Sequence, residues 1–161
     1  MFSYQIFSVG SLSHIPHFLN PDTQHLIISG NQIIKLESGL TYYSELLTLN
    51  MSFNQISSLG MDQFMSQTNL LSLDLSSNLV SKLRVGAFNG LESLTRLNMR
   101  ENRIERLSSA VFTGLYYNIL IFEILCLVEK ILKYLSKLPA CLFGLTAHIE
   151  TLCLVAAKFW I

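Results

Sequence analysis

The residues that could carry out chemistry are few and poorly placed for it. His14 and His17 are three positions apart, a spacing that can serve a metal ion, but they flank Pro16. A proline fixes φ and favours extended chain before it, so the two imidazoles do not converge. We therefore expect surface histidines and no metal site. Serine is plentiful, yet no GxSxG, Walker or HExxH pattern accompanies it. The sequence predicts a protein that is not an enzyme and uses no cofactor.

The cysteines also point away from metal or redox chemistry. Cys126, Cys141 and Cys153 all lie in the last quarter of the chain, and no pair has the CxxC spacing of zinc or thioredoxin-type sites. An odd number of cysteines leaves at least one thiol unpaired within the chain. We interpret all three as buried apolar thiols.

Charge and hydropathy argue against a nucleic-acid partner and against a membrane span. The 161 residues include eleven basic and eleven acidic ones, so the formal charge is zero, whereas a nucleic-acid-binding domain is expected to be basic. Mean hydropathy is +0.42, but charges interrupt every apolar run before the roughly 18–20 residues that a membrane span needs. The N-terminus lacks basic residues before its apolar run and is a poor signal peptide. We expect no nucleic-acid partner and no membrane span.

An internal repeat organises the chain. Four segments align on an asparagine, and successive asparagines are 23, 24 and 24 residues apart. They are Asn31, Asn54, Asn78 and Asn102. An aliphatic residue follows two positions after each asparagine and a leucine five positions after it; ten positions after it, three of the four segments have phenylalanine, at Phe64, Phe88 and Phe112. This many coupled positions indicates a solenoid of stacked coils, a coil being one turn of the chain per repeat.

The local pattern predicts what each coil looks like. Leucines alternate with polar residues before each asparagine, as in Leu73-Asp74-Leu75, which is the spacing of a strand with one buried face. The asparagine stands where the strand must turn, and a buried carboxamide there can satisfy backbone groups that no neighbouring strand reaches. We therefore predict a structural asparagine ladder, with the phenylalanines plugging the convex side of the coils.

The pattern LxxLxLxxNxLxxL with a following phenylalanine resembles the leucine-rich-repeat family, in its 24-residue extracellular type. The segment before the first repeat is similar to the IPxxLPxxTxxL junction of Toll-like receptors, Slit proteins and small leucine-rich proteoglycans. Ile15, Pro16, Leu19, Pro21, Thr23 and Leu26 occupy its places. The cysteine cluster that usually precedes this junction is missing, since no cysteine stands before Cys126.

The resemblance implies an α/β solenoid: a leucine-rich-repeat horseshoe segment with a short parallel β-sheet on the concave face and irregular or 3₁₀ turns on the convex side. We assign 1–22 to a remnant of an N-terminal cap or a leader and 23–115 to four regular repeats. Residues 116–134 form an irregular insertion, and 135–161 form degenerate or truncated further repeats.

The irregular segment has three interpretations. It can be a repeat with an insertion, an amphipathic helix over about 118–135, or a retained intron. Apolar residues at helical spacing, Leu120, Ile124, Leu127, Ile131 and Leu135, favour the helix. A good repeat resumes seven residues later than the repeat spacing predicts, which favours a repeat with an insertion or a retained intron.

The concave face is the expected binding surface, because the strand residues between the buried leucines point out of the sheet. The exposed set comprises His25, Ile27, Ser29, Thr48, Asn50, Ser52, Phe53, Ser72, Asp74, Ser76, Ser77, Arg96, Asn98, Arg100 and Glu101. The ligand-binding candidates among them are Thr48, Asn50, Phe53, Ser72, Asp74, Arg96, Asn98 and Arg100. Phe53 and Arg100 are of the types that dominate interfaces. Asp74 and Arg96 can alternatively form an ion pair across two strands.

The expected partner is a protein ligand or co-receptor. By resemblance the protein is an extracellular or cell-surface binding module, a fragment of a longer array, and Asn50-Met51-Ser52 is then a glycosylation sequon. Two alternatives stay open. The poor signal peptide fits a cytoplasmic scaffold or regulatory subunit, and the broken register after Tyr116 fits a truncated, non-functional product.

Overall fold

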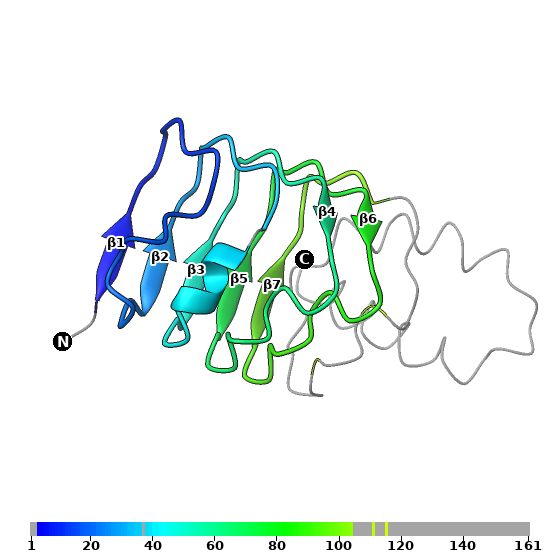
Figure 1. Ribbon diagram of the computed structural model, residues 1–161. Coiled ribbons are helices and arrows are strands. Elements are labelled where there is room, and N and C mark those ends of the chain that lie inside the picture. Colours follow the sequence, from blue (N-terminus) through cyan, green and yellow to red (C-terminus); the bar gives the residue numbers. More distant parts are fainter. Residues whose placement is uncertain (1–2, 37, 105–110, 112–114, 116–161) are drawn as a thin grey trace, which may run out of the picture.

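The computed structural model describes residues 3–36, 38–104, 111 and 115. In this part the chain winds into stacked coils, and each coil adds one strand to a parallel sheet (Figure 1). The sheet has the order β1-β2-β3-β5-β7. Its strands are β1 (Tyr4–Ile6), β2 (His25–Ile27), β3 (Thr48–Asn50), β5 (Ser72–Asp74) and β7 (Arg96–Asn98). The predicted solenoid with a short parallel sheet is confirmed.

The register of the sheet places the repeated leucines level with one another. Leu26, Leu49, Leu73 and Leu97 are successive Cα partners across the four C-terminal strands, and each is at most 2% exposed. They form a continuous apolar column because strand side chains alternate between the two faces of the sheet. A single coil cannot bury this column without its neighbours.

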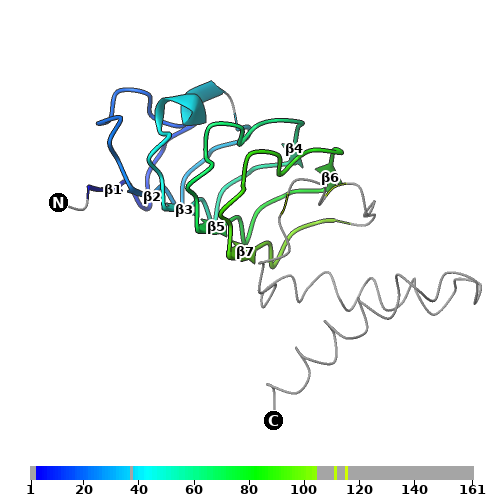
Figure 2. The ribbon, with the colours of Figure 1, turned by 90° about the horizontal axis from the view of Figure 1, so that it is seen from below.

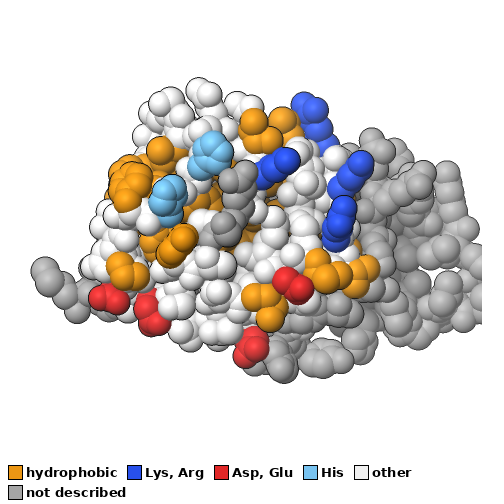
Figure 3. Space-filling model, in the orientation of Figure 1, with side chains coloured by type: hydrophobic (Ala, Val, Ile, Leu, Met, Phe, Trp, Pro, Cys, Tyr) orange, Lys and Arg blue, Asp and Glu red, His pale blue; other side chains and the backbone are white. Residues whose placement is uncertain are grey.

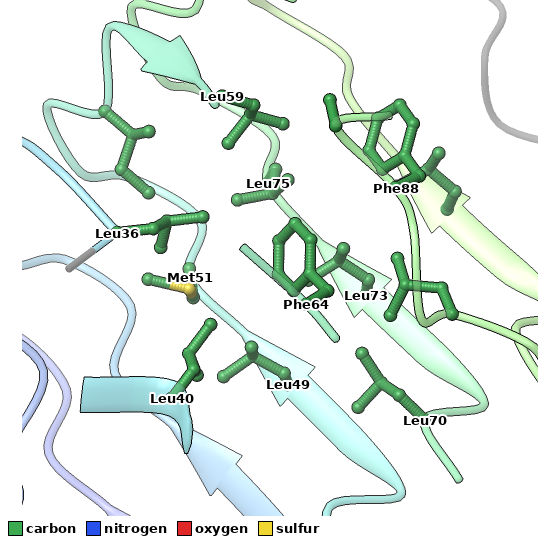
Figure 4. Packing of buried hydrophobic residues seen from close by; sticks show 14 of the residues in the cluster. Leu36, Leu40, Leu49, Met51, Leu59, Phe64, Leu70, Leu73, Leu75 and Phe88 are labelled. Carbon is green, nitrogen blue, oxygen red and sulfur yellow. The ribbon is translucent and has the colours of Figure 1, made fainter. Parts of the chain in front are cut away.

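The core lies between the sheet and the returning half of each coil (Figure 4). Met51 and Leu75 add a second inward position just after β3 and β5. From the opposite side Phe64 and Phe88 close the interior, and both are fully buried. The third phenylalanine of the pattern, Phe112, lies outside the described residues.

The convex side is less regular than the sheet. A 3₁₀ helix, η1 (Ser38–Tyr42), covers the face opposite the five strands (Figure 2). Gln67 of the next coil donates hydrogen bonds from Nε2 to the carbonyls of Leu40 and Tyr43, which links the end of η1 to that coil. The other returning segments are extended or turn, and no α-helix occurs in the described ranges.

A second sheet was not predicted. The short strands β4 (Ser58–Leu59) and β6 (Lys82–Leu83) pair in parallel on adjacent coils. The sequence predicted only irregular or 3₁₀ turns here, but two equivalent extended segments one coil apart lie in register and can hydrogen-bond. The helix expected near 118–135 and the segments 116–134 and 135–161 lie outside the described residues.

The N-terminal segment forms a shortened first coil. β1 pairs in parallel with β2, and Phe7, Leu12 and Leu19 pack partly buried against the core. The Tyr43 hydroxyl donates a hydrogen bond to the carbonyl of Pro16, and burial raises the pKa of Tyr43.

Within the described ranges, no helix combines the length and the hydropathy required to cross a membrane.

Candidate binding surface

The outward side chains of the five strands form two rows across the concave face. The register aligns a first row of Tyr4, His25, Thr48, Ser72 and Arg96. It aligns a second row of Ile6, Ile27, Asn50, Asp74 and Asn98. Each row changes from aromatic or aliphatic side chains at β1 to polar or cationic ones at β7. The candidates predicted on strands thus come together on one face.

An asparagine after each of β2, β3, β5 and β7 binds its coil to the preceding one. The Asn78 amide donates to the carbonyls of Met51, Leu75 and Ser76 at 3.0–3.1 Å, and its Oδ1 accepts from the Ile56 amide at 3.0 Å. Met51 and Ile56 belong to the preceding coil, and Leu75 and Ser76 to its own. The carboxamide therefore satisfies main-chain groups of two coils at once.

The same bonds recur in the other repeats. In Asn31, Asn54 and Asn102 the side-chain Nδ2 donates a hydrogen bond to a carbonyl of the preceding coil, and Oδ1 accepts a hydrogen bond from a main-chain amide of that coil. All of these partners are main-chain atoms on the inner side of the strand ends. The asparagines thus hold the coils together from the inner side, while side-chain pairs such as Asp74–Asn98 add links between coils across the outward rows.

Short-range hydrogen bonds fix the ends of β3 and β5. Asn50 Oδ1 accepts from the Ser52 amide at 2.9 Å and from the Ser52 hydroxyl at 2.7 Å. Asp74 repeats this arrangement with Ser76 at 2.8 and 2.6 Å. An aspartate cannot be N-glycosylated, so the Asn-x-Ser pattern at Asn50 has a structural explanation of its own: the side-chain oxygen closes a turn.

Asp74 offers a direct test of this explanation. We expect Asp74→Asn to change the free energy of unfolding by less than about 1 kcal/mol, because an amide oxygen can accept the same two bonds. Asp74→Ala should cost about 1–2 kcal/mol, since the Ser76 amide loses its acceptor. Urea-induced unfolding followed by circular dichroism measures both. Equal costs for the two variants would show that the acceptor is unimportant.

The residue before each ladder asparagine has a left-handed backbone. Gly30, Phe53, Ser77 and Glu101 have φ between 52° and 67°, and Val9 of the first coil has φ 53°. We call these five residues the rim. Ser77 and Glu101 are adjacent along it and joined by a hydrogen bond of 2.6 Å between the hydroxyl and Oε2. Phe53 is 66% exposed, as an outward aromatic was expected to be.

Two expectations about this surface need correction. Ser52 was placed among the exposed residues but is only 5% exposed, because β3 ends at Asn50 and the Ser52 hydroxyl folds back onto it. Asp74 lies opposite Asn98, whereas Arg96 lies opposite Ser72. The Asp74 carboxylate accordingly accepts from Asn98 Nδ2 at 3.2 Å and from Ser76, in place of the alternative ion pair with Arg96.

Sequence reasoning missed the first strand of the surface. Tyr4 and Ile6 extend both rows and are 58% and 62% exposed, and the Tyr4 ring stacks on the His25 ring at 4.2 Å. The alternation Tyr4-Gln5-Ile6 was a usable signal, but Gln5 stands where the other coils have leucine. Gly10 likewise stands where they have asparagine.

The two histidines considered as metal ligands lie apart from this surface. His14 Nδ1 is 2.7 Å from the Ser13 hydroxyl, and the His17 ring contacts the rings of Phe18 and Tyr42, the last residue of η1. Figure 3 views the η1 side and shows histidines among hydrophobic side chains over the N-terminal coils. Within the described residues no group of three or more potential ligands could hold a metal ion.

Comparisons with known proteins agree with this geometry. Residues 68–116 match the family described as Leucine rich repeat, and residues 45–65 match a second family of the same description. A search of curated proteins gave no match. A crystal structure of the TLR13–ssRNA13 complex is similar with a TM-score of 0.58 and 25% identity, over 61% of this chain and 14% of that chain.

An internalin of Listeria monocytogenes is also similar, with a TM-score of 0.49 and 25% identity over 60% of this chain and 27% of that one. This chain therefore spans only a small part of the length of either protein. The repeat pattern, the asparagine ladder, the parallel sheet and the family matches agree with one another. The chain has the leucine-rich-repeat fold, and leucine-rich-repeat family models match it over residues 45–65 and 68–116.

Proposed function

We propose that this protein is a non-enzymatic binding module that recognises another protein with its concave face. Leucine-rich-repeat proteins are generally interaction modules. The residues that we propose as contacts are Thr48, Asn50, Phe53, Ser72, Asp74, Arg96, Asn98 and Arg100, together with Tyr4 and Ile6 of the first coil.

One observation carries the proposal: the buried groups that hold the coils together lie on the inner side of the sheet, whereas the outward rows stay accessible. The leucine column and the asparagine ladder point inward. The rows across β1 to β7 are half-buried or exposed and span five strands. Such a face can present on the order of 20 residues, the size of one side of a standard protein interface.

We further propose an extracellular or cell-surface location. The junction similar to that of Toll-like receptors supports it, and its residues have structural roles here: Pro16 accepts the Tyr43 hydrogen bond, and the Thr23 hydroxyl donates to the carbonyl of Asn20. In that location a glycan on Asn50 would stand at the centre of the concave face. Mass spectrometry of the natively expressed protein tests both proposals. A glycan on Asn50 would exclude a cytoplasmic location, whereas binding at the concave face predicts that the binding-competent form carries no glycan on Asn50.

A matched pair of substitutions tests the binding function. Phage-displayed random peptides would be selected on the full chain, and their affinity then measured for Ser72→Tyr and Ser81→Tyr. Ser72 lies in the first row on β5, whereas Ser81 is exposed just before β6 on the other side of the coil.

We expect Ser72→Tyr to weaken binding at least about tenfold, because a bulky ring covers the middle of the face, and Ser81→Tyr to change it less than about twofold. Thermal unfolding of both variants controls for folding. Equal effects of the two substitutions, or a stronger effect of Ser81→Tyr, would contradict binding at the concave face.

A further inference from the structure

The two ends of the concave face differ in chemistry. At the β1 end Tyr4, Ile6 and Val9 are 58–89% exposed, and Phe53 stands two rim positions beyond Val9. At the β7 end Arg96 is exposed and Arg100 half-buried. Small polar side chains such as Thr48 and Ser72 separate the ends. One ligand that contacts both ends must offer an apolar group to the first and an anionic group to the second.

At the apolar end two rim residues of a type that is unusual for a left-handed backbone are exposed. Val9 and Phe53 adopt left-handed φ values of 53° and 54°, a conformation that glycine and asparagine accept more readily and that is an outlier for a β-branched or bulky residue. Neither side chain compensates by packing in the core, since they are 89% and 66% exposed. Strain kept without a packing gain is typical of a functional position.

Gly30 is the rim residue between them and carries no side chain. A Cβ at Gly30 would lie 3.2–3.4 Å from Val9 atoms, so Val9 packs directly against the Gly30 backbone. The exposed apolar surface of this part of the rim therefore comes from Val9 and Phe53. Ile6 and Ile27 stand next to each other in the second row at the same end.

The polar end carries two guanidinium groups that can bind an anion. The carboxylates there are engaged by neutral donors: Asp74 accepts from Ser76 and Asn98, and Glu101 accepts from the Ser77 hydroxyl. No carboxylate of the described residues lies within ion-pair distance of the guanidinium of Arg96 or Arg100. Guanidinium groups bind carboxylates with strong, often bidentate hydrogen bonds.

The distance between the ends fits an extended peptide segment. The sheet has five strands, so four inter-strand steps of about 4.8 Å separate β1 from β7, roughly 19 Å. An extended chain covers that distance in roughly six residues at about 3.3 Å each. Aliphatic Ile6, Ile27 and Val9 at the apolar end match aliphatic or aromatic side chains better than they match nucleotide bases, which favours a protein over a nucleic acid.

We infer, resting on the proposed function, that the partner presents an extended polypeptide segment that runs across the strands. An apolar side chain of the segment lies over the Val9–Gly30–Phe53 part of the rim. An acidic side chain roughly four to six residues away along the segment, three to four inter-strand steps on, binds Arg96 and Arg100.

The first experiment exchanges the charge of the polar end. Random dodecapeptides displayed on phage would be selected on the full chain and on the double variant Arg96→Glu, Arg100→Glu. We expect peptides selected on the natural chain to carry Asp or Glu about four to six residues from an apolar residue, and to lose at least about tenfold in affinity on the double variant. Peptides selected on the double variant should carry Lys or Arg instead.

The second experiment tests the apolar end with equivalent rim positions. Phe53→Gly and Ser77→Gly both relax a left-handed residue, so neither should lower the melting temperature appreciably. We expect Phe53→Gly to lower the affinity for the selected acidic peptides at least about tenfold, and Ser77→Gly to lower it less than about threefold.

The outcomes distinguish this inference from the proposed function. Suppose that Ser72→Tyr blocks the selected peptides but that these peptides show no preference for acidic residues, or that Phe53→Gly does not change their affinity. Either result would overturn the inference while binding at the concave face would stand. Peptides insensitive to Ser72→Tyr would overturn both. Tighter binding of a single-stranded oligouridine than of any selected peptide, abolished by Arg96→Glu, Arg100→Glu, would overturn the protein partner in favour of RNA.

Discussion

Replacing Asn78 with alanine should lower the free energy of unfolding by about 2–3 kcal/mol, because the buried amide of Ile56 loses its acceptor and three main-chain carbonyls each lose one of two donors. The substitution removes the donor shared by the carbonyls of Met51, Leu75 and Ser76 and the acceptor of the Ile56 amide. Asn78 itself is only 3% exposed. Urea-induced unfolding followed by circular dichroism measures the loss.

Asn89→Ala is the matched control. It removes the same amide group, but Asn89 makes one exposed hydrogen bond of 2.7 Å, to Asp62 Oδ1 on the convex side. Surface substitutions of this kind usually change stability by about 0.5 kcal/mol or less. If Asn78→Ala cost no more than Asn89→Ala, the asparagine ladder would not hold the coils together.

Gly90→Ala should destabilise the protein by about 3 kcal/mol or more, through backbone strain and a steric clash between coils. Gly90 has φ +90°, which L side chains rarely adopt. An added Cβ would lie 2.3 Å from the carbonyl oxygen of Phe64 and 2.5 Å from Cα of Met65. Both atoms belong to the backbone of the preceding coil, so relief requires that the two coils separate locally.

Gly60→Ala separates this effect from the general consequences of replacing glycine. A Cβ at Gly60 would approach only the Gln63 side chain, at 3.5 Å or more, which is ordinary van der Waals contact. We expect a change within about 1 kcal/mol, with a small gain in stability if the loss of unfolded-state entropy dominates. A Gly90→Ala variant as stable as Gly60→Ala would mean that the coils tolerate a wider separation than the structure shows.

The fold could be predicted because the residues that determine it recur at fixed spacing. An inward leucine, a turn asparagine and a following aliphatic residue occur in four segments, as in Leu73, Asn78 and Val80. One such match would be weak evidence, but repetition makes the stacking unambiguous. Side-chain alternation within each strand then assigns the outward rows, which is why most of the candidate surface could be read from the sequence.

The remaining features depend on local geometry that the repeat pattern does not encode. Alternation stops where a strand ends, so it misplaced Ser52, whose hydroxyl turns back to Asn50. β1 was not recognised because Gln5 replaces the inward leucine of the pattern. The β4–β6 pairing arises from the stacking of two convex segments whose own sequences, around Ser58 and Lys82, carry no strand signal.

The asparagine ladder also bears on how such a protein changes in evolution. Each carboxamide contacts only main-chain atoms of the neighbouring coil, so the joint between coils does not depend on which side chains the neighbour carries. A coil that keeps its inward leucine and its asparagine is interchangeable with another, and it can be duplicated or deleted as a module. The outward residues can then diverge under selection for new specificities while the architecture is preserved.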